Sequence, residues 1–246
     1  MSTRRVAIVG MMPLYLMMSH PFTAEVRRTM DPVTTFAEKH IQWLGHATFK
    51  FTGSSVTVYS DPFNLTDRSG GATADIILVT HPHYDHLSPE DIARLRSTGT
   101  VVLAPDDPEC RAKLSGNVRF MKPGDTTTVH GVLVRAVPAY NIGKNFHPKD
   151  KRWIGYIITI DAVRIYIAGD TDRIPEMKTF TADIALLPVG GTYTMSAVET
   201  AEAAQDINPK LAIPMHYGSV VGATKDAEKF RQQLSGTVRV IVKSAL

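Results

Sequence analysis

The segment T-H-P-H-Y-D-H-L, residues 80–87, directly follows the apolar run 76–79. It gathers three histidines and one aspartate within six positions: His81, His83, Asp85 and His86. Neutral imidazoles and ionised carboxylates are the ligands that zinc, iron and manganese accept. A surface loop that happens to contain histidine explains this poorly, because the whole chain has only 9 histidines. The segment therefore predicts a metal site at the end of a buried strand.

The spacing within this segment favours two ions over one. Alternate residues of an extended stretch face the same side, so His81 and His83 can point at one ion. A turn at Tyr84 then lets Asp85 and His86 face a neighbouring ion. Ligand clefts in α/β folds tend to lie at the carboxyl ends of strands, and the segment begins at such an end.

Two other expected strand ends carry metal-ligating residues. Asp170 lies in the run 165–171, where its carboxylate can bridge two ions, although the residue would also suit a turn or a helix cap. His216 follows the apolar run 211–214. A lone histidine is more often structural than a ligand, but three strand ends of this kind favour a common site.

The bulk composition is that of an ordinary globular chain. Its 246 residues, 43% of them apolar, can form one large domain or two small ones around a sizeable core. The 27 basic and 24 acidic residues are too balanced to indicate nucleic-acid binding. The single cysteine, Cys110, excludes a disulfide framework within the chain. A small-molecule substrate is therefore the expected partner, and the oligomeric state stays open.

The first 38 residues have the character of a leader or spacer. Arg4 and Arg5 precede the uncharged stretch 6–18, which has the length of a signal-peptide core and is short for a membrane span. An apolar segment packed on the domain is the alternative. Localisation thus stays open between a cytoplasmic protein and one exported or membrane-anchored through residues 4–18. Residues 39–246 are expected to form the functional domain.

Short apolar runs separated by turn residues predict the order of elements. Strands are expected at residues 41–44, 48–51, 56–59, 76–79, 101–104, 118–121, 126–129, 132–137, 154–160, 163–168, 184–187, 211–214 and 238–242. Helices are expected after Ser88, over about 105–116, after the capping box at Ser196 and over 225–234. The polar stretch 141–153 is expected to form a loop. The order indicates an α/β fold of two packed sheets with helices outside.

Several motifs, in this order, resemble the metallo-β-lactamase superfamily, and within it the small metal-dependent hydrolases related to ascorbate-6-phosphate lactonase. They are G-H-A-T-F at 45–49, D-P at 61–62, T-H-P-H-Y-D-H at 80–86, A-G-D-T at 168–171, L-P-V-G-G-T-Y-T-M at 187–195 and P-M-H-Y at 214–217. The resemblance covers residues 40–246. It implies a four-layer αββα sandwich with a two-metal site on one edge.

The resemblance also implies a ligand set. His81 and His83 would bind the first metal; Asp85, His86 and His216 would bind the second, with Asp170 bridging. Asp61 would orient a ligand imidazole, and His46 would lie near the substrate.

One departure from the family pattern concerns the first metal. The family usually has another histidine after the strand at 132–137, where this chain has Tyr140 or Asn141. His147 is the nearest replacement, because six extended residues of about 3.3–3.6 Å each can reach across a site edge. The alternative is that His147 is an exposed loop residue and the first metal binds weakly. His130, expected in a hairpin turn, is a poorer candidate.

Two divalent ions, zinc or else manganese or iron, would lower the pKa of a shared water. The resulting metal-bridging hydroxide would attack an ester, lactone or phosphodiester bond. Asp85 would take the proton of this nucleophile, and His46 or Tyr217 would donate to the oxyanion or leaving group. No G-x-S-x-G motif offers a serine mechanism. A metal-binding protein with little or no catalysis is the alternative, and a β-lactam substrate is a weaker expectation.

Overall fold

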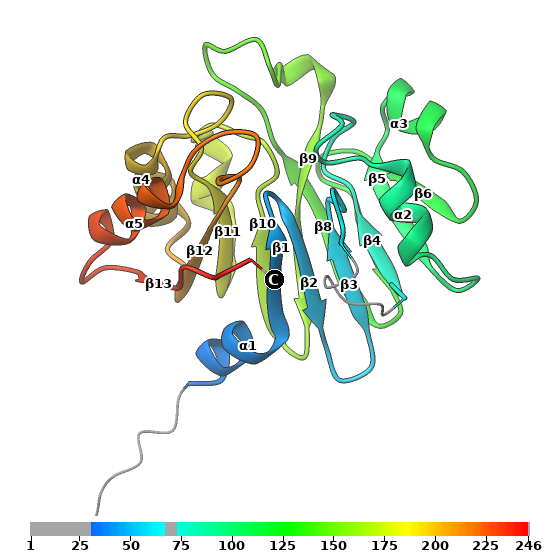
Figure 1. Ribbon diagram of the computed structural model, residues 1–246, viewed down its shortest axis with the longest axis horizontal. Helices are drawn as coiled ribbons and strands as arrows, with labels where there is room; N and C mark the ends of the chain where they lie inside the picture. Colours follow the sequence, from blue (N-terminus) through cyan, green and yellow to red (C-terminus); the bar gives the residue numbers. More distant parts are fainter. Residues whose placement is uncertain (1–30, 67–72, 246) are drawn as a thin grey trace, which may run out of the picture. The chain divides into compact units, whose positions relative to one another are not determined.

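The computed structural model describes residues 31–66 and 73–245, which belong to one compact unit starting at Asp31 (Figure 1). The predictions for the leader at residues 4–18 lie outside the described residues. Within the described part, no helix combines the length and the apolar character needed to cross a bilayer.

The first sheet has six strands in the order β1-β2-β3-β4-β5-β6. Its strands are β1 (Ile41–Gly45), β2 (Thr48–Thr52), β3 (Thr57–Ser60), β4 (Ile76–Leu78), β5 (Val101–Pro105) and β6 (Val118–Met121). The first three run antiparallel, and β3 to β6 run parallel. Every residue of β4 and β5 is buried, as is typical of parallel strands covered on both faces.

The second sheet has seven strands in the order β13-β12-β11-β10-β9-β8-β7. Its strands are β7 (Thr126–Val129), β8 (Val132–Pro138), β9 (Ile154–Ile160), β10 (Val163–Ile167), β11 (Ile184–Pro188), β12 (Leu211–Met215) and β13 (Arg239–Val240). Strands β10 to β13 run parallel, and β7 to β10 run antiparallel. The last strand is shorter than the expected 238–242.

Helices cover the outer faces of both sheets, which gives the four layers expected from the resemblance (Figure 1). The helices are α1 (Pro32–His40), α2 (Pro89–Leu95), α3 (Pro108–Lys113), α4 (Ala197–Ile207) and α5 (Thr224–Gln233), with short 3-10 turns at Lys149–Lys151 and Pro175–Thr179. Ile92 and Leu95 of α2 pack with Ile77 and Val102 of the first sheet. Helices α4 and α5 contact β11 and β12, and the main core fills the space between the sheets.

Helix α1 lies mostly within residues 1–38, the stretch expected to be a leader or spacer. Asp31 caps this helix, because its Oδ1 atom accepts the N–H groups of Val33 and Thr34. Pro32 occupies the first turn, where its missing N–H costs nothing. Val33 and Phe36 are buried in the main core, so the folded unit begins earlier than the expected boundary at residue 39.

The two sheets meet along the rim where the parallel strands end. Ile154 N–H donates to Thr80 O at 3.2 Å, and His216 N–H donates to His46 O at 2.9 Å. Strands β3 and β4 are parallel neighbours in one sheet, and β10, β11 and β12 are parallel neighbours in the other. The loops after these strands therefore converge on one edge, which is where the candidate ligands lie.

Candidate metal centre

The Asp170 carboxylate lies within a cluster of buried imidazoles from three other segments of the chain. Its Oδ2 atom is 3.2 Å from His147 Nε2 and 3.1 Å from His216 Nε2. Its Oδ1 atom is 3.3 Å from His86 Nε2, and Oδ2 is 3.9 Å from His81 Nε2. The structure thus brings together strand ends that are up to 135 positions apart in the sequence, from 81 to 216.

The polar atoms of this cluster fit a cation. Several buried side-chain atoms make no hydrogen bond: His81 Nε2, His86 Nε2, His147 Nε2, His216 Nδ1 and Nε2, and Asp170 Oδ1. The imidazole nitrogens approach Asp170 without the alignment of a hydrogen bond. Buried polar atoms are normally paired, so a convergent set of unpaired nitrogen and oxygen donors is typical of a metal site. This donor chemistry suits zinc, and also manganese or iron.

The donors divide into two groups that a third group connects. One group contains His46, Asp85, His86 and His216, and the other contains His81, His83 and His147. His81, His86 and Asp170 form the connecting group. Within each group the candidate ligand atoms all lie within 4.8 Å of one another. Asp170 belongs to the connecting group, which shares His86 with the first group and His81 with the second.

Asp61 orients the His86 imidazole. Its Oδ2 atom lies 2.8 Å from His86 Nδ1, and its carboxylate also accepts the Thr80 N–H at 2.8 Å and the Thr80 hydroxyl at 2.7 Å. The residue is completely buried. These contacts fix the ring of His86 with Nε2 facing Asp170, which is the kind of support that metal-ligating histidines usually have.

His147 reaches the cluster from the polar loop that follows β8. Asn141 holds it there: Asn141 Oδ1 accepts the His147 backbone N–H at 3.0 Å and lies 3.0 Å from the ring Nδ1. The Asn141 N–H donates to His147 O at 2.7 Å. Asn141 therefore positions a histidine that lies six residues later in the chain. His130 is exposed in the hairpin turn, with Nε2 3.0 Å from Gly99 O.

Three residues of this rim have backbone conformations that side chains rarely adopt. His46, Asp61 and His216 have φ values of +50°, +40° and +59°. Such strain is typical of functional sites, where the surrounding structure stabilises it. At His216 the space is also tight: a Cβ at Gly190 would lie 2.5 Å from His216 O and 3.2 Å from His216 Nδ1. Glycine at position 190 lets the chain pass close behind the imidazole.

The electrostatics keep both central carboxylates ionised. Burial raises the pKa of Asp85, but the hydrogen bond from His46 at 3.0 Å and the charge of His86 outweigh it and lower this pKa to about 2. Burial also raises the pKa of Asp170, but His216 and His86 hold it well below the usual range. Burial lowers the pKa of His86, yet Asp170, Asp61 and Asp85 raise it to about 9.

Three other imidazoles have lowered pKa values. Burial is the main cause that lowers the pKa values of His46, His81 and His83, and neighbouring imidazoles lower them further. These rings are therefore neutral at physiological pH, which is the form that binds a metal ion.

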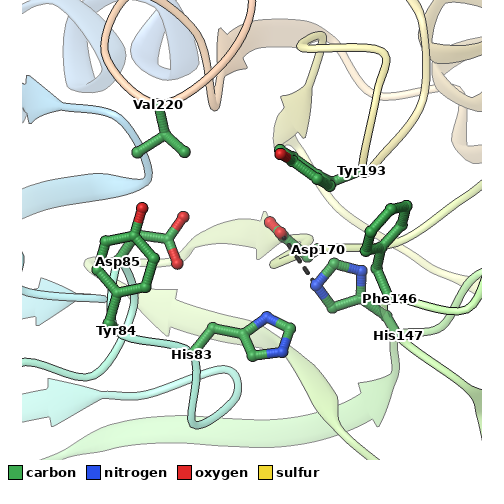
Figure 2. Close-up of a pocket in the computed structure, with 8 residues that line it drawn as sticks. All are labelled: His83, Tyr84, Asp85, Phe146, His147, Asp170, Tyr193 and Val220. Carbon is green, nitrogen blue, oxygen red and sulfur yellow. Dashed lines mark ion pairs between the residues drawn. The ribbon is translucent and has the colours of Figure 1, made fainter.

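A cavity of about 260 Å³ opens onto this cluster (Figure 2). Its lining consists of His83, Tyr84, Asp85, Phe146, His147, Asp170, Tyr193 and Val220. In Figure 2, Tyr84 and Asp85 lie on one side, Phe146 and Tyr193 lie on the other, and Asp170 lies between them. Asp85 and Asp170 are thus the carboxylates that a molecule in the cavity would meet.

Tyr217 lies apart from this cavity. Its ring packs 4.7 Å from that of Trp43 in the main core, and it is not among the lining residues. Burial raises its pKa to about 12. The expected donor role of Tyr217 therefore has no geometric support.

Tyr193 lines the cavity instead, together with Phe146, Tyr84 and Val220, none of which the sequence singled out as a site residue. The sequence could have pointed only to Tyr193, because this residue lies in the G-G-T-Y-T-M segment, one of the motifs that carry the family resemblance.

Comparisons with known proteins bear on the family and the fold. A profile described as a Beta-lactamase superfamily domain matches residues 40–216. The UPF0173 metal-dependent hydrolase of Methanoculleus marisnigri is 36% identical over 213 residues, covering 82% of this chain and 91% of the relative. That of Thermococcus kodakarensis is 33% identical over 215 residues, covering 82% and 95%. A crystal structure from Parabacteroides distasonis, classed as a metal-dependent hydrolase, has a TM-score of 0.75 and 35% identity, covering 84% of this chain and 93% of that one.

Proposed function

Because the chain belongs to the metallo-β-lactamase superfamily and is a metal-dependent hydrolase, we propose that it cleaves an ester, lactone or phosphodiester bond at a centre of two divalent ions. The position of Asp170 carries this proposal. Its Oδ2 atom is 3.2 Å from His147 Nε2, which belongs to one donor group, and 3.1 Å from His216 Nε2, which belongs to the other. One carboxylate that touches both groups supports a shared, two-ion centre.

The donor groups divide the ligands between the ions. His81, His83 and His147 would hold the first ion; Asp85, His86 and His216 would hold the second, with Asp170 bridging. Zinc is the proposed metal, and manganese or iron would suit the same nitrogen and oxygen donors. Bound at this position, the ions would acidify water and polarise the carbonyl or phosphoryl oxygen of the substrate.

Asp85 is the proposed general base. It lines the cavity, and its pKa, lowered to about 2, keeps the carboxylate ionised. Because so low a pKa makes the carboxylate a weak base, the proposal rests on its position beside the cavity. His46 donates to it at 3.0 Å, which supports a positioning role for His46. A general base that is held in place by a hydrogen bond to a second residue is a common arrangement in hydrolytic sites.

Tyr193 is the proposed proton or hydrogen-bond donor, in place of Tyr217. It lines the cavity, and its backbone oxygen accepts a hydrogen bond from Asn141 Nδ2 at 3.0 Å. The loop that carries His147 and the segment that carries Tyr193 are therefore joined. This hydrogen bond supports a fixed position of Tyr193 relative to His147, a proposed ligand of the first ion.

A metal titration with an activity panel tests the proposal. The metal-free chain is titrated with Zn²⁺, Mn²⁺ and Fe²⁺, and its metal content is compared with its turnover of an aryl ester, a γ-lactone and a diaryl phosphodiester. Two ions per chain are expected, with turnover that chelation abolishes and metal restores. Saturation at one ion without turnover on any substrate would instead support a metal-binding protein. Turnover that chelation leaves unchanged would overturn the metal mechanism.

A further inference from the structure

The mouth of the cavity gathers exposed apolar side chains. Tyr84, Phe146 and Val220 are 66%, 46% and 36% exposed, and all three line the cavity. Large apolar side chains at the surface are ordinary when they are scattered, but a group of them around a concave site marks a binding surface. Ile142, 55% exposed, lies on the same loop as Phe146 and extends the apolar character of this side.

Contacts between aromatic rings hold the two walls of the cavity in place. The Tyr84 ring packs edge-on against Phe63 at 5.8 Å, and Phe146 packs edge-on against Tyr193 at 4.8 Å. Tyr84 lies on the loop after β4, whereas Phe146 and Tyr193 come from loops of the second sheet, and Figure 2 shows them on opposite sides of the cavity. A flat group can therefore enter between them.

The walls of the cavity carry no charge apart from the proposed metal ligands. Among the described residues that line it, none is lysine or arginine, and the two aspartates, Asp85 and Asp170, are proposed metal ligands. The ammonium group of Lys144, on the His147 loop, is already engaged by Asp172 at 2.6 Å and by the Thr194 carbonyl at 2.7 Å. An anionic group on the substrate, away from the reacting bond, would find no cationic side chain to pair with.

We propose that the part of the substrate beyond the cleaved bond is an uncharged, apolar group, seated between Tyr84 on one side and Phe146 with Tyr193 on the other, below Val220. This inference rests on the proposed function, because it takes the reacting bond to lie at Asp85 and Asp170. A cavity of about 260 Å³ has room for a short alkyl chain or a single ring. The proposal excludes substrates with a carboxylate or phosphate at that end.

Matched substrate series test this inference on whichever bond the holoenzyme cleaves. One series carries unbranched alkyl tails of two to six carbons, and a second carries the same tails ending in a carboxylate. Each methylene that the cavity buries is expected to raise kcat/KM about fourfold until the cavity is full. A terminal carboxylate is expected to lower kcat/KM at least about tenfold relative to the neutral tail of equal length.

Three variants test whether these residues cause the dependence of kcat/KM on the length and charge of the tail. Phe146→Ala and Tyr84→Ala should flatten the dependence on tail length while metal content stays at the wild-type value. Val220→Lys should raise kcat/KM for the carboxylated tails relative to the neutral ones, a gain that a damaged fold cannot imitate. Leu133→Ala is the control, because Leu133 is 48% exposed on β8 and is not among the lining residues.

The outcomes separate this inference from the proposed function. A holoenzyme that turns over all tails equally, or prefers the carboxylated ones, overturns the apolar subsite and leaves the hydrolase proposal standing. Unchanged tail selectivity in all three variants also overturns it. Failure of the proposed function would show differently, as a lack of metal-dependent turnover on every member of both series.

Discussion

Asn141 Oδ1 lies 3.0 Å from both the backbone nitrogen and the ring Nδ1 of His147. The backbone N–H can only donate, and the amide oxygen can only accept, so the ring is stabilised in the tautomer that carries its proton on Nδ1. Nε2 is then left with a free lone pair 3.2 Å from Asp170 Oδ2. An asparagine at position 141 therefore makes a loop histidine competent to bind a metal.

His147→Ala should lower the metal content of the purified chain from two ions to about one, because the first ion would keep only His81, His83 and the bridging carboxylate. Elemental analysis after dialysis measures this. His130→Ala is the matched control, since His130 is exposed in a hairpin turn. Unchanged stoichiometry in His147→Ala would make His147 a bystander.

Asp170→Asn should weaken both sites together, because the amide cannot supply two anionic oxygens. Removal of a ligand or of its support typically costs at least about 10–100-fold in metal affinity, and here both ions should be affected. Competition with a coloured chelator gives the two dissociation constants. Asp150→Asn removes an exposed carboxylate on the same rim loop as His147 and should change neither value. Loss of only one ion in Asp170→Asn would contradict a bridging role.

Asp85→Ala should reduce kcat by about 10²–10⁴-fold, which is the usual contribution of a general base. The far-ultraviolet circular dichroism should not change, because Asp85 lies in a loop outside the named strands and helices. The assay uses saturating metal, so that loss of affinity is not mistaken for loss of the base. Wild-type turnover in this variant would remove Asp85 from the mechanism.

Gly190→Ala should destabilise the chain by about 1–3 kcal/mol, as overpacking in a tight interior does. The new Cβ would lie 2.5 Å from His216 O, a backbone atom that cannot move without displacing the imidazole. Urea unfolding of the metal-free protein measures the effect on folding alone. Gly99→Ala provides the comparison, because no atom lies within 4 Å of its Cβ position. Equal stabilities of the two variants would contradict the tight packing at His216.

Metal binding should release a proton between about pH 6.5 and pH 9. In the metal-free fold, carboxylates raise the pKa of His86 from 6.5 to about 9, so the ring is protonated at pH 7.5 and must lose its proton to bind an ion. Apparent affinity should therefore rise with pH across this range. Calorimetry in buffers of different ionisation enthalpy counts the protons released.

The same shift predicts how the metal-free fold responds to pH. His86 has a higher pKa folded than unfolded, so the stability it contributes is complete below about pH 6.5 and is lost as the pH rises through about 9. Urea unfolding at several pH values measures this loss. His86→Gln provides the comparison, and its stability should be nearly independent of pH in that window.

The order of strands could be predicted from the sequence because buried runs and turn residues are local signals. The hairpin at His130 and Gly131 and that at Asp161 and Ala162 occur where expected, all four residues having positive φ. The sequence analysis does not predict helix α1, although Asp31 before Pro32 is the usual signature of a helix start. The apolar stretch 6–18 suggests a leader, and the domain is therefore expected to begin only at residue 39. The pairing order of the strands depends on contacts between residues far apart in sequence, and the sequence did not predict it; the resemblance implied only the four layers.

The candidate ligands could be selected because histidine and aspartate, placed repeatedly at the ends of buried strands, contribute little to apolar packing. The walls of the cavity could not, since Phe146 and Val220 are ordinary apolar residues until the fold brings their loops together. Tyr217 illustrates the limit: it follows His216 in the sequence, yet its ring turns into the core against Trp43. Because the chain turns sharply at the end of a strand, two residues that are adjacent in sequence can point their side chains in different directions.

The boundary between the two sheets also divides the donors. The two larger donor groups each combine residues from the first sheet with one histidine from the second: His147 belongs to one group and His216 to the other. Neither sheet alone supplies every donor of either group, so the full donor sets exist only where the two sheets pack together.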